Sequence, residues 1–344
     1  MKRIVAFLIV ASIVFMGSTW VSAQTQIAAS SSQATLSAKG SSDNSGWVTV
    51  NPAISVGYFS ILGATEYTLT ARGNGIGGVR ERLYDFRNSP GVMLAGTLPF
   101  TFGKRLEATL SGSWAIPVGS TDVKHVDFAL PKETALLGGR TWEAETNWLT
   151  GDFKVSYAII KDFDILKALS PVVGLKYDYW KTKYDDPHKV SPGFPVAAPT
   201  DTAEFYTSAL LPYIGLTATI GGLKIGAFGG DLKLSAIGGW IAWGKVKHYE
   251  TRDALGPRQD TFKGDLHGGG YFFDFGEFSI DYTLFSFPLS KKIQGSLSLF
   301  AKYNLFNAQG GLDGTRYTSG ESDKFDFNID RYSATVGISA ALTF

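Results

Sequence analysis

"RYSATVGISAALTF", residues 331–344, closes the chain and alternates apolar residues with small or polar ones along its length. One set consists of Tyr332, Ala334, Val336, Ile338, Ala340, Leu342 and Phe344. The other set consists of Arg331, Ser333, Thr335, Gly337, Ser339, Ala341 and Thr343. Because successive side chains of a β-strand point to opposite faces, this pattern predicts a strand with one apolar face and one polar face. The apolar face suits lipid, and the other suits a polar or tightly packed lumen.

The same period of two recurs upstream, in "FSIDYTL" (278–284) and "GSLSLFAKYNLF" (295–306). A soluble β-sandwich would also alternate, so the periodicity alone does not separate the two classes. Long predicted strands, aromatic residues near many strand ends and Phe344 as the last residue favour a membrane barrel. A terminal aromatic residue on a final amphipathic strand resembles the insertion signal of bacterial outer-membrane barrels.

The N-terminus has the layout of a secretory signal peptide. Lys2 and Arg3 precede a short apolar run, and Val21-Ser22-Ala23 predicts cleavage after Ala23. The run lacks a stop-transfer pattern, so we do not interpret it as a permanent membrane helix. Residues 24–46 are rich in Ser and Ala and lack aromatic residues. We therefore expect a signal peptide (1–23), a flexible tail (24–46) and a barrel domain (47–344).

The composition narrows the class of protein further. Removing Lys2 and Arg3 with the signal peptide leaves 30 basic residues against 31 acidic ones. This balance offers no basic surface for nucleic acid, so we expect no nucleic-acid partner. The chain has no cysteine, which excludes disulfides and thiolate metal sites, and we expect no cofactor or metal. The aromatic fraction of 14%, with a mean hydropathy of +0.03, fits a barrel better than a bundle of membrane helices.

The pattern predicts an all-β, antiparallel transmembrane barrel of about ten strands. The expected strands are 47–68, 80–100, 105–125, 143–160, 171–185, 203–221, 231–250, 261–287, 291–308 and 325–344. Ten is an even number, as bacterial barrels require. An extra hairpin within "GGLKIGAFGGD" (221–231) would raise the number to twelve. Residues 126–142, 186–202, 251–260 and 309–324 are expected as outer loops.

At several places the chain resembles the omptins, a family of ten-stranded outer-membrane proteases. The residues that carry the resemblance are "AISVGYFSILGATEY" (53–67), "LYDFRNSPGVMLAG" (83–96), "WAIPVGS" (114–120), "LPYIGLTATI" (211–220) and "GGWIAWGKVKHY" (238–249). The most specific of these is "LPYIGLTATI", which is similar to a Pro-Tyr-Ile-Gly-Leu strand of that family. The resemblance is spread over most of residues 47–344 but is thin at each place.

The resemblance implies a site of two facing pairs, Asp-x-Asp and Asp-x-His, across an outer groove. His248 matches the family's histidine, and Asp127 matches the first aspartate of the other pair. Val246 and Ala129 stand where the family has its other two acids. Glu250 lies on the same strand face as His248 and is the candidate to replace the missing partner. Glu66 falls where the family has a substrate-facing acid, although a solvated residue at a strand end is the plainer interpretation.

We expect an omptin-like barrel of a Gram-negative envelope, with a degenerate protease site and a surface, structural or binding role. One alternative is an active endopeptidase that uses His248, Glu250 and Asp127. The other is a narrow channel for small solutes. Lys176, Asp178, Lys233, Asp281 and Lys302 alternate with apolar residues and are expected to form paired networks in the lumen. The expected partners are outer-membrane lipid and an extracellular peptide or small solute, with the protein as a monomer.

Overall fold

The computed structural model describes most of the predicted barrel domain. The described residues are 48–71, 79–84, 86–118, 121–129, 136–190, 202–225, 228–252, 258–270, 272–290, 292–315 and 322–344. The predicted signal peptide (1–23) and flexible tail (24–46) lie outside them. Every regular element in the described ranges is a β-strand. Within those ranges, no helix has the length and apolar character needed to cross a bilayer.

Seventeen strand segments form ten barrel strands, because segments that continue one another pair with the same neighbours. In chain order the barrel strands are β1 with β2 (Val48–Val50, Ala53–Ala71), β3 with β4 (Val79–Tyr84, Phe86–Phe102), β5 with β6 (Leu106–Pro117, Thr121–Ala129), β7 with β8 (Leu136–Tyr157, Ile160–Phe163), β9 (Leu166–Val190), β10 (Thr202–Ile225), β11 with β12 (Phe228–Gly239, Trp243–Arg252), β13 with β14 and β15 (Arg258–Asp265, His267–Gly268, Phe275–Pro288), β16 (Gln294–Thr315) and β17 (Ser322–Thr343).

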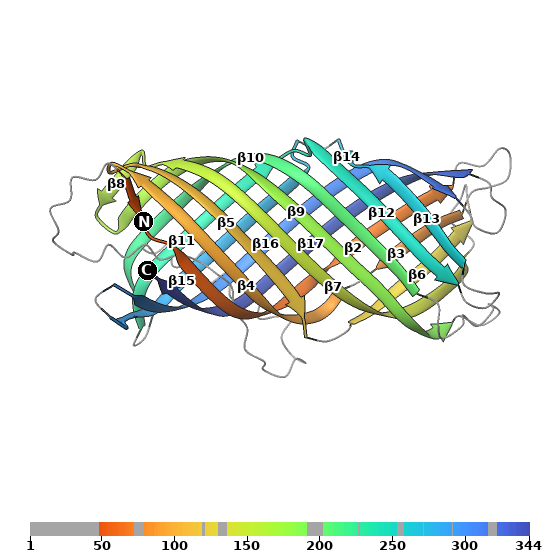
Figure 1. Cartoon of the computed structure of the whole chain (residues 1–344), viewed down its shortest axis with the longest axis horizontal. Coiled ribbons are helices and arrows are strands. Elements are labelled where there is room, and N and C mark those ends of the chain that lie inside the picture. The colour runs from red at the N-terminus through yellow and green to blue at the C-terminus, as the bar shows by residue number, and fades with distance from the viewer. Residues whose placement is uncertain are drawn as a thin grey trace.

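The barrel is closed and antiparallel. Each barrel strand pairs with the next, and β17 pairs with β2 from Phe325–Ala71 to Thr343–Ala53, which leaves no open edge. Figure 1 shows the strands inclined to the long axis of the cylinder, with both ends of the described chain at one end of it. The predicted all-β transmembrane barrel of about ten strands is therefore confirmed.

The segment 221–231, which left the choice between ten and twelve strands open, lies at a hairpin between two barrel strands. β10 continues to Ile225, and β11 returns from Phe228. The register slips between Ile220 and Leu223, where Gly222 has a φ of 67° that an L side chain rarely adopts. The two glycines therefore make a β-bulge inside the sixth barrel strand. The alternative of twelve strands is wrong.

The strands are longer than a bilayer requires. β9 has 25 residues, which span roughly 80 Å along the strand and about 60 Å after a tilt of about 45°, against a hydrocarbon core of about 30 Å. Strand structure therefore runs into the ranges expected as outer loops, as in β6, β7 and β9. Because the connections at the end that carries the chain termini are short turns, we assign that end to the periplasm and the extended end to the outside.

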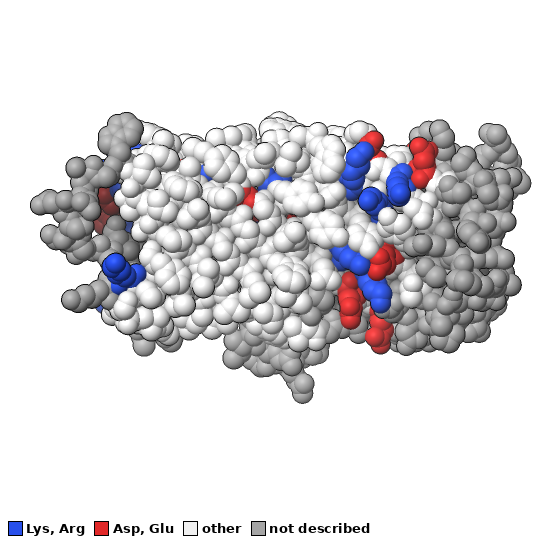
Figure 2. Space-filling view, viewed as in Figure 1, with Lys and Arg blue, Asp and Glu red and all other residues white. Residues whose placement is uncertain are grey.

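An uncharged belt surrounds the part of the barrel nearer the chain termini. Figure 2 shows one face of this belt as a largely white surface, with most of the acidic and basic side chains of that face gathered towards the other end. Large apolar side chains such as Ile54, Leu110 and Phe153 are exposed on the outward face of the belt. On β12 the outward-facing Trp243 precedes Lys245, which marks the outer border of the lipid-facing surface.

The two faces of the last strand agree with the alternation in the sequence. Tyr332 is 49% exposed on the outside, whereas Thr335 is 4% exposed and lies on the lumen side. Arg331, Ser333 and Ser339 are also buried. The inward-facing side chains of this strand therefore pack inside the lumen, as expected of a barrel of this size.

Candidate functional site

The four site residues suggested by the sequence lie in the outer half of the barrel. His248 and Glu250 belong to β12, Asp127 to β6 and Glu66 to β2. β6 is part of the third barrel strand and β12 part of the seventh, so Asp127 and His248 are on facing walls of a ring of ten. Of these four side chains, only that of His248 is among the described ones, so the proposed catalytic and substrate-binding roles stay predictions.

His248 lies inside the barrel and not in an open groove. Its side chain is 6% exposed. In the register of the sheet it lies beside Phe205 of β10 and Phe262 of β13, and both rings are close to the imidazole. The centroid distances are 6.5 Å to the Phe205 ring, which meets the imidazole edge-on, and 5.8 Å to the Phe262 ring.

Apolar side chains fill the lumen around His248. Val246, which stands where the omptin resemblance would require an acid, is 1% exposed. We call this packed region of the lumen the outer plug. Its buried members on five barrel strands are Phe205, Val246, Phe262, Leu312, Phe327 and Ile329. An acid at position 246 would be buried in this plug, where a carboxylate without a partner is very costly.

Below the outer plug, one buried ion pair crosses the lumen. The Nη2 of Arg331 donates to Oδ2 of Asp178 at 2.6 Å. The indole Nε1 of Trp148 donates to the other oxygen of Asp178, also at 2.6 Å. The guanidinium lies 4.5 Å from the ring centroid of Trp180 and 4.7 Å from that of Phe306. Both charges are therefore paired, and the arginine stacks on the apolar residues above it.

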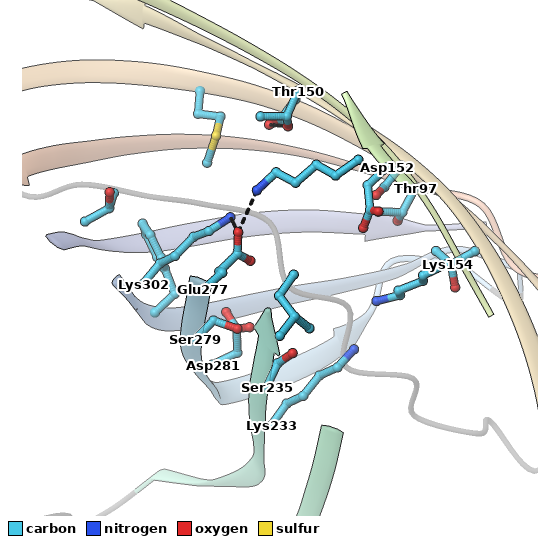
Figure 3. A pocket seen from close by; sticks show the side chains of 18 of the residues that line it. Thr97, Thr150, Asp152, Lys154, Lys233, Ser235, Glu277, Ser279, Asp281 and Lys302 are labelled. Carbon is cyan, nitrogen blue, oxygen red and sulfur yellow. Dashed lines mark hydrogen bonds and ion pairs between the residues drawn. The ribbon is translucent and has the colours of Figure 1, made fainter. Parts of the chain in front are cut away.

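Further towards the periplasm, a single carboxylate holds two lysines. Oε2 of Glu277 accepts hydrogen bonds from Nζ of Lys176 and Nζ of Lys302, each at 2.7 Å. Figure 3 shows Glu277 and Lys302 joined in this way on one wall of a polar cavity of about 200 Å³. Tyr213 closes another side by donating its hydroxyl to Asp152 at 2.8 Å. The lower lumen is thus a hydrogen-bonded and charged layer.

Glu277 was not recognised as a lumen charge in the sequence, and Arg331 was placed on the lumen face but not in the expected network. The expected network contained Lys176, Asp178 and Lys302, but their acid and base partners, Glu277 and Arg331, come from other strands. A signal for Glu277 was available, because it shares the lumen face with Asp281 four residues later. Nothing in the sequence pairs Asp178 with Arg331, which lies 153 residues away.

A second set of charges lies outside the barrel wall, beyond the aromatic border. Lys181 Nζ is 2.9 Å from Oε1 of Glu204, and the Tyr206 hydroxyl donates to the other oxygen of that carboxylate. Partial burial would raise the pKa of Glu204, but the hydrogen bonds from Tyr206 and Lys181 outweigh it and hold the pKa below its usual range. Lys245 and Asp265 form a further ion pair on the neighbouring strands. In the described part of the chain, no group of three or more His, Asp or Glu side chains is arranged to hold a metal ion.

Comparisons with known proteins agree with the fold. No family model matches the sequence, and no curated protein matches it. The structure is similar to that of the outer membrane protease OmpT from Escherichia coli, with a TM-score of 0.58, 13% sequence identity and coverage of 86% of this chain and 96% of that one. The outer membrane protein OprG from Pseudomonas aeruginosa aligns with a TM-score of 0.32 and 12% identity, over 86% of this chain and 97% of that one.

A likeness at 13% identity concerns the fold and does not assign the chain to the omptins. The closed barrel, its exposed apolar belt and this likeness point the same way. The chain therefore has the fold of the outer-membrane β-barrels, and the outer-membrane location expected from its sequence agrees with that fold.

Proposed function

We propose that this protein is a closed outer-membrane β-barrel with a structural or binding role at the cell surface, and that it is not an omptin-like protease. The observation that carries the proposal is the environment of His248. Its imidazole is 6% exposed and lies between the rings of Phe205 and Phe262. A general base has to reach both a water molecule and the substrate, and this imidazole is enclosed by apolar side chains.

The residue at position 246 supports the same proposal. A histidine that acts as a base is normally held in one tautomer by a carboxylate or carbonyl group. Val246 occupies the position that the omptin resemblance assigns to that carboxylate, and it packs into the outer plug. Glu250 is the alternative partner that the sequence suggests, two positions further along β12. An endopeptidase that uses Glu250 and Asp127 would need the outer plug to open.

The outer plug also weighs against the narrow channel. A conduit for ions or polar solutes needs a continuous polar path, and rings of apolar side chains close such a path by excluding water. Phe262, Leu312 and Phe327 face the lumen from three neighbouring strands above the charged layer. We propose that outer-membrane lipid is the main partner of the barrel, that the protein is a monomer, and that any peptide or solute binds at the outer surface.

A cleavage assay tests the proposal. The folded, purified protein is incubated with peptides that carry paired basic residues, in parallel with His248→Ala. We expect no cleavage by either protein. Cleavage by the unmodified protein that His248→Ala abolishes would overturn the proposal and favour the endopeptidase. His248→Gln serves as the matched control, since it keeps the size of the side chain and removes the base.

Conductance across planar bilayers tests the channel. We expect no steady current from the unmodified protein. Phe262→Ala combined with Phe327→Ala is the matched variant, because it opens the outer plug and leaves the wall of the barrel unchanged. A steady current through the unmodified protein would overturn the closed-barrel proposal.

A further inference from the structure

The polar cavity below the outer plug is lined by more basic than acidic residues. Its charged lining consists of Lys154, Lys176, Lys233 and Lys302 with Asp152, Glu277 and Asp281. Four lysines and three acids therefore line the cavity itself, and a fourth acid, Glu107 of β5, lies near Lys154. The cavity is enclosed by the lipid-spanning part of the wall, where an uncompensated charge is costly.

The ion pairs of Glu277 leave two lysines of the cavity outside them. Glu277 takes both Lys176 and Lys302. Lys154 of β7 and Lys233 of β11 have no hydrogen bond or ion pair among the interactions of the described residues. Figure 3 shows these two side chains directed towards the same open part of the cavity, with their ammonium groups facing each other.

Acids lie near both lysines: Asp152 and Glu107 near Lys154, and Asp281 beside Lys233. Asp152 precedes Lys154 by two residues on the same face of β7, and its Oδ1 accepts the hydroxyl of Tyr213. Asp281 is the cross-strand neighbour of Lys233. Two cations that face each other across a low-dielectric cavity repel each other, so the arrangement is stabilised by an anion between them.

The cavity has the size and the donors for such an anion. A volume of about 200 Å³ is far above the roughly 10–15 Å³ that a single water needs on the same scale. Ser111, Ser235 and Ser279 add hydroxyl groups to its lining. Ammonium groups and hydroxyl groups donate short, charge-assisted hydrogen bonds to oxyanions.

We propose that this cavity binds a small oxyanion, of the size of phosphate or sulfate, between Lys154 and Lys233. The anion offsets the repulsion between the two lysines and joins β7 to β11 across the inside of the barrel. The site is independent of the outer plug and of any activity at His248.

Calorimetric titration with inorganic phosphate tests the site. The folded protein in a zwitterionic detergent is titrated at constant ionic strength, because weak binding of anions is screened by salt. We expect one phosphate per barrel. Lys154→Met and Lys233→Met should each lower the affinity roughly tenfold or more, as expected for the loss of one charge-assisted hydrogen bond.

Two control variants separate the loss of the anion site from a change in the overall charge of the barrel. Lys292→Met removes the same charge from an exposed turn at the periplasmic end and should bind phosphate like the unmodified protein. Lys154→Arg keeps the cation and should retain most of the affinity. Absence of binding by the folded unmodified protein would overturn the proposal. Equal losses in Lys292→Met and Lys154→Met would also overturn it, because they would point to the overall charge of the barrel.

Discussion

The two halves of the lumen are built from the same alternating strands but carry different kinds of side chain. In the outer half, inward-facing side chains such as Phe262, Leu312 and Phe327 form an apolar plug around His248. In the periplasmic half, hydroxyl groups, acids and lysines line a cavity together with apolar side chains such as Phe59 and Phe300. Arg331 lies at the border, paired below with Asp178 and stacked above on Trp180 and Phe306.

The difference between the halves follows from what lies outside the wall. The periplasmic half is surrounded by lipid, so its outer face is apolar and its lumen carries the polar residues. The outer half extends past the bilayer, so its outer face carries charges such as Lys181 and Glu204. Its lumen can then hold a core of the kind found in a soluble β-protein. In the periplasmic half the wall is thus apolar outside and more polar inside. In the outer half it is more polar outside and apolar inside.

Removing the cation at the border between the halves should have the largest effect. Arg331→Leu leaves Asp178 buried without its charged partner, which typically costs about 3–5 kcal/mol. Urea titration of the folded protein in lipid would measure the loss. Adding Asp178→Asn should recover most of it, since Asn can still accept the hydrogen bond from Trp148. A double variant as unstable as the single one would contradict this account of the border.

A cavity in the outer plug should cost nearly as much. Leu312 is fully buried, and Leu312→Ala should destabilise the barrel by about 2–5 kcal/mol. Thr335→Ala, in the periplasmic half beside the existing cavity, should cost only about 1 kcal/mol. The same urea titration compares the two variants. Equal losses would show that the two halves pack alike.

Placing a cation on one face of the wall or the other tests which face meets lipid in the periplasmic half. Val336→Arg places a cation towards lipid and should cost about 2–4 kcal/mol, whereas Thr335→Arg faces the hydrated lumen and should cost less. Refolding yield in vesicles of defined lipid would rank the two. A more damaging Thr335→Arg would mean that the lumen has no room for the added side chain.

The smallest effect on stability should come from the outward-facing charges of the outer half. Because the pKa of Glu204 is lowered in the folded protein, its contribution is present above its ordinary pKa of 4.5 and is lost as the pH falls through the folded value. The pair faces outwards and is only partly buried, so we expect less than about 1 kcal/mol. Stability measured at about pH 6 and about pH 3 should differ less in Glu204→Gln than in the unmodified protein. An unchanged difference would assign the acid sensitivity to other groups.

Much of the wall of the barrel could be predicted from the sequence. The alternation in 331–344 identifies both faces of the last strand, and the same reasoning finds the number of barrel strands. The lengths of the strands could not be predicted in this way. Beyond the bilayer the outward face becomes polar, as at Lys245 and Lys247, and the signal that separates a strand from a loop weakens.

The candidate site was less accessible to sequence reasoning. The sequence identified His248 and its position near the outer end of the seventh barrel strand. It could not show that Phe205 and Phe262 enclose the imidazole, because that contact depends on the register of β12 against two neighbours. The side chains of Asp127, Glu250 and Glu66 are not described, and their roles stay predictions.

By itself, the sequence determines that this chain forms strands with one lipid-facing and one lumen-facing side, since that property is local and repeats every two residues. Only the tertiary structure decides which lumen residues meet. Asp178 and Arg331 are joined across 153 residues, and Lys154 and Lys233 face each other from two strands that are not neighbours. The physical reason is that the strands close into a ring. The register and curvature of the whole ring set which side chains meet in the lumen, and no single strand encodes them.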